Sequence, residues 1–267
     1  MSTGYFSHTL QNLSDYKNDL ESIKGLSAKA SEIKKDAVAL IAANSTYMNH
    51  LQNELQASCK LMLSDLQKAL TVVNDNNIKG INLIKDTNKR AMEFNKKTED
   101  AIVYNGNLKT KALGFSNELH LVLAELENKV HKLSAEEQKA KDKADKYKKE
   151  KYYFLALGPF GVAGLATATS LFATWNSKAK KASDKVNKVR REIAQVRKFQ
   201  SQLNELQESF AISIELISNS KNALVLLTGD INTILSNSTV SGLTNEVLIV
   251  YLKASITQLE IIQTDIA

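Results

Sequence analysis

The stretch of sequence that decides the fold is residues 152–175, which read YYFLALGPFGVAGLATATSLFATW without one charged side chain. As a single helix it would be about 36 Å long, enough to span a hydrocarbon core of about 30 Å. Gly158, Pro159 and Gly161 argue against an uninterrupted helix, because glycine and proline end or kink helices. The stretch therefore predicts a turn at these three residues between two apolar helical ends.

Lysine-rich segments flank this apolar stretch on both sides. Residues 129–151 and 178–198 contain nine basic residues each, against five and two acidic ones. Together they carry a net charge of +11, while the whole chain carries +6. Basic residues near a membrane surface attract anionic lipid by about 1 kcal/mol each. We therefore predict lipid-headgroup contacts for the nearest lysines, which are Lys148, Lys149, Lys151, Lys178, Lys180 and Lys181.

Apolar residues recur at spacings of three and four through most of the chain. The series from Val186 to Ile217 is close to a sustained heptad seam, and the series from Leu119 to Leu133 has the same spacing. A short turn joins the two longest predicted helices, near 108–157 and 162–227, so we expect them to lie antiparallel with their seams facing. Further helices are expected near 5–24, 26–73, 78–103, 230–236 and 243–266. The breaks between them are expected at residues 74–77, Asn105-Gly106, Gly229-Asp230 and residues 236–242.

The composition agrees with this helical pattern. The chain of 267 residues has ten glycines and one proline, where average usage gives about 19 and 13. All-β sandwiches need more of both residues. We predict an all-α fold, an elongated bundle of long antiparallel helices that forms one domain over residues 1–267. Its short hydrophobic head, residues 152–175, lies at one helix–helix turn.

Catalytic and metal-binding patterns are missing from the sequence. The spacing of Gly158, Gly161 and Gly164 matches neither a dinucleotide fingerprint nor a P-loop. Cys59 is the only cysteine and is predicted to be a small packed residue. No metal-ligand spacing connects the four histidines, which are His8, His50, His120 and His131. We predict no enzyme activity, no metal and no cofactor.

The sequence pI of about 9.1 makes nucleic-acid binding a hypothesis worth testing against the residues. The basic segments are dominated by lysine and have no interleaved aromatic residues for base stacking. An apolar stretch between them has no use on nucleic acid. We predict no nucleic-acid partner.

Three interpretations of residues 152–175 differ in what the apolar side chains contact. They are the core of a bundle, a permanent membrane anchor, and a head that enters a target-cell lipid membrane only on demand. Dense lysine flanks argue against a core segment, and a permanent anchor would have to tolerate the glycine–proline break as a kink; we favour the third interpretation. The residues predicted to insert are Tyr152, Tyr153, Phe154, Leu155, Leu157, Phe160, Val162, Leu165, Leu171, Phe172 and Trp175.

A head of this kind has to be hidden while the protein is soluble. An exposed patch made by the whole stretch would exceed the few hundred Å² typical of monomers. We therefore expect a soluble homo-oligomer whose copies bury their heads together. A classical secretory signal has a basic region, then an apolar region, then a cleavage site of small residues. The first 20 residues do not show this order, so we expect secretion without a classical N-terminal signal.

The apolar stretch and its basic flanks resemble those of a known family. The head, preceded by KADKYKKEK and followed by NSKAKKASDKVNKVRRE, resembles that of the cytolysin A-type α-helical pore-forming toxins. Among them the chain is most similar to the smallest, C-type component of the tripartite Ahl and Smh systems. The resemblance implies a secreted bacterial toxin subunit that binds the target membrane and recruits other toxin subunits into a lytic pore.

One departure from the family limits the role that is carried over. The head is short and broken by Pro159, which favours anchoring or priming over lining the pore. The alternative is a coiled-coil structural protein held permanently in its own membrane by residues 152–175.

Overall fold

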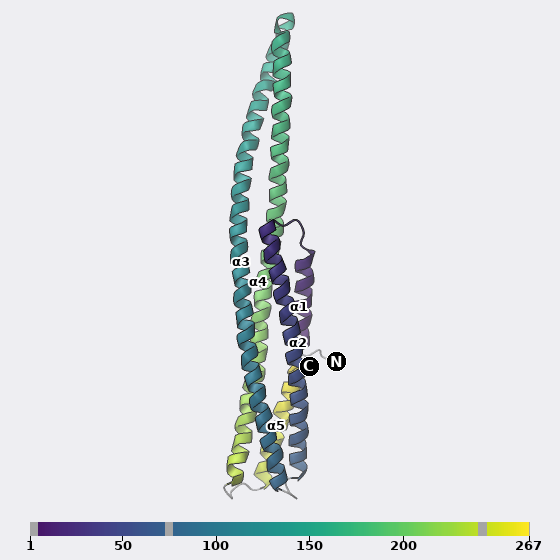
Figure 1. Ribbon diagram of the computed structural model, residues 1–267, viewed down its shortest axis with the longest axis vertical. Helices are drawn as coiled ribbons and strands as arrows, with labels where there is room; N and C mark the ends of the chain where they lie inside the picture. Colours follow the sequence, from purple (N-terminus) through teal and green to yellow (C-terminus); the bar gives the residue numbers. More distant parts are fainter. Residues whose placement is uncertain (1–4, 73–76, 240–244, 267) are drawn as a thin grey trace. The chain divides into compact units, whose positions relative to one another are not determined.

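The structure, a computed structural model, describes residues 5–72, 77–239 and 245–266. In these ranges every element is helical, which confirms the all-α prediction (Figure 1). The elements are α1 (Tyr5–Ser22), α2 (Ala28–Val72), α3 (Asn77–Ala156), η1 (Gly158–Gly161), α4 (Val162–Thr239) and α5 (Asn245–Ile266).

The predicted break at Asn105-Gly106 is wrong, because α3 continues through it. The buried amide of Asn105 donates to the carbonyl oxygen of Ala101 at 2.9 Å and to the sulfur of Met48 at 3.6 Å. Asn105 is fully buried, and core residues such as Ala101 and Leu108 lie on both sides of it. Tertiary packing of α3 therefore overrides the local turn signal.

The predicted break at Gly229-Asp230 is also wrong, since α4 runs on to Thr239. Thr233 Oγ1 donates to the carbonyl oxygen of Gly229 at 2.9 Å, and Asp230 accepts from Gln258 Nε2 of α5 at 3.2 Å. Leu227 and Ile231, on either side of the predicted break, are fully buried in the core, so packing continues through it. Residues 74–76, and residues 240–242 of the predicted polar break, lie outside the described ranges.

The chain divides into two compact units. Unit 1 consists of Met1–Ser22, Lys35–Gly114 and Gln202–Ala267, and unit 2 consists of Ile23–Lys34 and Phe115–Ser201. The single domain expected from the sequence stays a prediction.

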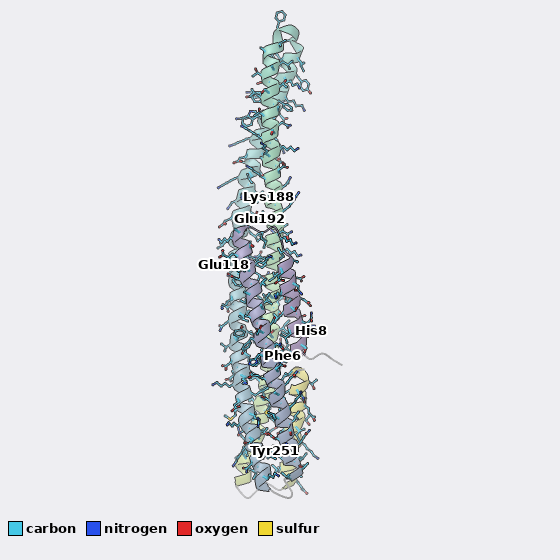
Figure 2. The ribbon with its side chains drawn as sticks, turned by 45° about the vertical axis from the view of Figure 1, so that its right-hand side comes forward. Phe6, His8, Glu118, Lys188, Glu192 and Tyr251 are labelled. Carbon is cyan, nitrogen blue, oxygen red and sulfur yellow. The ribbon has the colours of Figure 1, made fainter. Side chains whose placement is uncertain are left out.

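Unit 1 is built around one large hydrophobic cluster to which all five α-helices contribute. On α1, Phe6 is buried in the cluster, while His8 two residues later is exposed (Figure 2). On α2 the buried series passes through Cys59, as predicted for this residue. Gln52 donates to the carbonyl oxygen of Ile266 at 2.8 Å and so connects α2 to the end of α5. This unit contains large, closely packed apolar side chains throughout.

Unit 2 contains the parts of α3 and α4 that η1 joins, and they run antiparallel (Figure 1). The predicted seam is confirmed where large residues such as Leu119, Val196 and Phe199 are fully buried. Toward η1 the core changes. Between residues 127 and 185, which we call the distal hairpin, the buried apolar side chains among the described residues are all alanines. They are Ala140, Ala144, Ala168 and Ala179.

Candidate membrane-binding site

The turn at the end of the distal hairpin depends on two glycines. Gly158, two residues after the end of α3, has a φ of +59°, the left-handed conformation that glycine adopts without steric cost. At Gly161 a Cβ atom would collide with the backbone carbonyl oxygen of Phe154. A backbone atom cannot move aside as a flexible side chain can, so the close approach of α3 and α4 requires glycine here.

Phe154 closes the hairpin from inside. Its ring lies against Gly164, where an added Cβ would come within 2.5 Å of the ring atom Cε1. The same ring packs edge-on against Tyr153, with the ring centroids 5.7 Å apart. Phe154 is therefore half-buried, and part of its apolar surface already contacts protein.

The eleven residues predicted to insert divide into two groups. Six are exposed, and all lie between the last turn of α3 and the first residue of α4. We call them the apolar tip: Tyr152, Tyr153, Leu155, Leu157, Phe160 and Val162. Phe160 is 97% exposed, so within this chain almost nothing covers its ring. Several large apolar residues exposed together at the end of a hairpin are typical of an interaction site.

The other group is half-buried within unit 2. Besides Phe154 it contains four residues of α4, which are Leu165, Leu171, Phe172 and Trp175. Their apolar surface is partly removed from water in this structure, so they have less to gain from a membrane than the apolar tip has.

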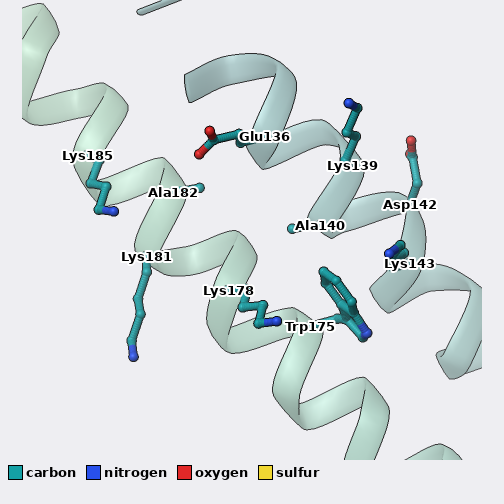
Figure 3. A pocket seen from close by; sticks show the side chains of 10 residues that line it. All are labelled: Glu136, Lys139, Ala140, Asp142, Lys143, Trp175, Lys178, Lys181, Ala182 and Lys185. Atoms are coloured by element: carbon teal, nitrogen blue, oxygen red, sulfur yellow. The ribbon is translucent and has the colours of Figure 1, made fainter. Parts of the chain in front are cut away.

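Trp175 marks the border between the apolar and the charged part of the distal hairpin. Its indole ring lies between two ammonium groups, Lys143 Nζ of α3 at 4.1 Å and Lys178 Nζ of α4 at 4.3 Å from the ring centroid (Figure 3). Both distances are in the range of cation–π interactions, which at exposed sites contribute about 0.5–1 kcal/mol each. Through its cation–π contact with Lys143, Trp175 of α4 is therefore linked to α3.

The six lysines predicted to meet headgroups do not form one cluster. Lys178 and Lys181 line a cavity beside Trp175, together with Lys139, Lys143 and Lys185. Lys148, Lys149, Lys151 and Lys180 are not part of the cavity lining. Sequence reasoning stressed the lysines nearest the apolar stretch and missed Lys139 and Lys143. The available signal was helical spacing, since positions 136, 139, 140 and 143 share one face of α3.

Among the residues that the structure describes, two helices are long and apolar enough to cross a membrane, judged by length and composition alone. The candidate segments are Val162–Ser236 of α4 and Glu246–Ile266 of α5, each with a best window of mean hydropathy 1.2. In α5, buried residues such as Leu252, Leu259 and Ile262 belong to the cluster of unit 1, as expected for a core helix. Within the described ranges, no three His, Cys, Asp or Glu side chains are placed to hold a metal ion.

Solved structures share this fold over the full chain. No protein-family model matches the sequence, and no curated protein matches it. Soluble AhlC of the tripartite α-pore-forming toxin AHL from Aeromonas hydrophila is 19% identical, with a TM-score of 0.77 over 100% of this chain and 98% of its own. The triple head mutant of AhlC is also 19% identical, with a TM-score of 0.79 over 99% of this chain and 98% of its own. This chain has the fold of an α-pore-forming toxin component.

The similarity extends to a subunit in an assembled pore. The SmhB pore of the tripartite toxin Smh from Serratia marcescens is 13% identical, with a TM-score of 0.60 over 98% of this chain and 95% of that one. The family resemblance inferred from the sequence is thus confirmed at the level of the fold.

Proposed function

We propose that this protein is a subunit of a multi-component α-pore-forming toxin that binds the target membrane through the apolar tip and helps to assemble a lytic pore. The observation that carries the proposal is the tip, where six large apolar residues lie exposed around a glycine-dependent turn. The fold shared with toxin components supports the same conclusion. The other subunits of the toxin would be its protein partners.

The driving force for insertion comes from surface that is exposed before the membrane is met. Four residues of the apolar tip, Leu155, Leu157, Phe160 and Val162, have side chains without a polar atom. At about 1.5–3 kcal/mol per fully buried large side chain, these four provide at most about 6–12 kcal/mol. The hairpin therefore has enough apolar surface for anchoring.

The length of the hairpin favours shallow insertion over a full span. From Val162 to Trp175, α4 rises about 20 Å, less than the roughly 30 Å of a hydrocarbon core. The lysine-rich segments of α3 and α4 both lie on the side of the apolar stretch away from the turn. Trp175 would then lie at the headgroup level, which aromatic rings prefer.

In solution, the apolar tip needs a cover. We propose that copies of the chain bury their tips against one another, because Phe160 and its neighbours find no cover within one chain. The protein would be secreted, remain soluble as this homo-oligomer, and expose its tips on meeting a membrane.

Flotation with phosphatidylcholine vesicles tests the proposal, using protein purified without detergent. Wild type is expected to float, and Phe160→Glu is expected to remain at the bottom, because a buried carboxylate costs several kcal/mol. Val103→Glu is the matched control, since Val103 is 63% exposed but lies in unit 1. Equal flotation of both variants, or none for wild type, would overturn the proposal. A protein that leaves its host membrane only in detergent would support the permanent-anchor alternative.

A further inference from the structure

A cavity of about 650 Å³ lies between α3 and α4 in the distal hairpin, next to Trp175 (Figure 3). Its wall contains five lysines, which are Lys139, Lys143, Lys178, Lys181 and Lys185. Two carboxylates, of Glu136 and Asp142, also line it, so the wall has a net charge of +3. Its volume is in the range of small-molecule binding sites.

The cavity lysines are not neutralised within the part of the chain that the structure describes. No carboxylate lies within ion-pair distance of any of the five. Other lysines on the same stretch of α3 have such partners one turn away: Lys141 is 2.6 Å from Glu137, and Lys146 is 3.9 Å from Glu150. A lining with a net charge of +3 and no ion pair to its lysines favours an anion, because lysine binds phosphate as a compact positive charge.

Trp175 gives the cavity an amphipathic end. Its ring separates Lys143 from Lys178, and its indole N–H has no acceptor among the described residues. Small side chains from both helices, Ala140 and Ala182, line the cavity without filling it. A ligand at this end would meet two ammonium groups, one N–H donor and an aromatic edge.

The position along the hairpin indicates where the anion comes from. The cavity extends along α4 from residue 175 to residue 185, about 15 Å, and begins where the charge-free stretch ends. With the apolar tip in the hydrocarbon, its Trp175 end lies in the headgroup layer, where lipid phosphates are found. Lys143 and Lys178 are the two lysines at that end.

We propose that the Trp175 end of this cavity binds phosphate groups of anionic phospholipids, through the ammonium groups of Lys143 and Lys178 on the two sides of the ring. The proposal rests on the proposed function for the way the cavity meets the membrane. The contact is local to this end of the cavity, since each of the two lysines meets a phosphate on its own side of the ring. Lys148, Lys149, Lys151 and Lys180 contribute only a general positive field.

The test compares two double variants with the same change in charge. Lys143→Gln/Lys178→Gln removes both lysines next to Trp175, and Lys148→Gln/Lys180→Gln removes two lysines outside the cavity on the same helices. Binding is measured by flotation with phosphatidylcholine vesicles, with and without phosphatidic acid, at one ionic strength. The cavity variant should lose about tenfold more affinity for the acidic vesicles than the control. Equal losses would show a general field only and would overturn the proposal.

Two further measurements separate this proposal from that of the apolar tip. The cavity variant should bind pure phosphatidylcholine as wild type does, whereas Phe160→Glu should bind neither vesicle. Trp175 is the only tryptophan of the chain, so its emission also reports on inorganic phosphate. If wild type binds no vesicle and its emission does not respond to phosphate, the cavity proposal fails together with the tip. A response to free phosphate as strong as the response to acidic vesicles would assign the cavity to soluble phosphate instead of lipid.

Discussion

Unit 1 and the distal hairpin are both built from long helices, but they bury side chains of different sizes. Unit 1 buries phenylalanine, leucine, isoleucine and methionine from five helices in one cluster. The distal hairpin buries only alanine side chains among its described residues and exposes its largest apolar ones at the tip. Since stabilisation scales with the apolar area removed from water, unit 1 has a strong core of its own and the hairpin has a weak one. The comparison indicates that the hairpin keeps its apolar surface for a partner outside the chain.

The same substitution in the two regions should have the most different effects on stability. Phe94→Ala in unit 1 is expected to lower the free energy of unfolding by about 3–5 kcal/mol, because Phe94 is 1% exposed and leaves a cavity. Phe160→Ala should change it by less than about 0.5 kcal/mol, since its ring is already in water. Urea unfolding followed by circular dichroism measures both. Similar losses for the two variants would contradict the comparison.

Cys59 reports on the core of unit 1. Burial raises the pKa of the Cys59 thiol to about 12, so at pH 8 almost none of it is thiolate, and the sulfur is also shielded. Alkylation by iodoacetamide should be on the order of a hundredfold slower in the native protein than in urea. Mass spectrometry of quenched samples measures the two rates. Fast labelling of native protein would show that this core opens readily.

Hydrogen exchange should distinguish the same two regions without any substitution. Backbone amides of residues 127–185 are expected to exchange at least about tenfold faster than buried-helix amides of unit 1, because few apolar contacts oppose local opening. Acidic vesicles should slow exchange in the hairpin and leave unit 1 unchanged. Exchange that is uniform along α3 would contradict the comparison.

Surface ion pairs should contribute least to the free energy of unfolding. Lys97 hydrogen-bonds to the Glu54 carboxylate at 2.9 Å and lowers the pKa of Glu54 below its ordinary 4.5. The pair therefore stabilises the fold above pH 4.5, and the contribution is lost as the pH falls through the lowered pKa. Lys97→Met should cost about 0.2–1 kcal/mol at pH 7 and less at pH 3. Lys96→Met, on an exposed neighbour, is the control in urea titrations at both pH values; equal costs at pH 7 would argue against the pair.

Much of the fold follows from local sequence pattern. Heptad spacing identified the buried seam of unit 2, because burial repeats every three to four residues in any packed helix. The breaks at Asn105-Gly106 and Gly229-Asp230 were wrong because the helices stay buried against other helices there, as at Leu108 and Ile231, which no local pattern reveals. Turn signals of this kind depend on tertiary context.

In the candidate site, too, the contiguous features could be predicted from the sequence and those that depend on tertiary structure could not. The charge-free stretch and its glycines are readable from the sequence because they are contiguous. The cavity around Trp175 is not, because Lys143 and Lys178 lie 35 residues apart and meet only once the register of α3 against α4 is fixed. The division of the head into exposed and half-buried residues depends on that register too. Leu165 is half-buried, so a charge there disturbs hairpin packing as well as insertion, and Phe160 is the cleaner position to test.

The central claim is that the apolar tip enters the bilayer while Trp175 stays at its surface. Depth-dependent quenching by lipids labelled near the headgroup or near the bilayer centre measures this directly. Trp175 in wild type should be quenched mainly by the shallow label, and the indole of Phe160→Trp, in a Trp175→Phe background, mainly by the deep one. Equal quenching by both labels at the two positions, or none at either, would contradict the account.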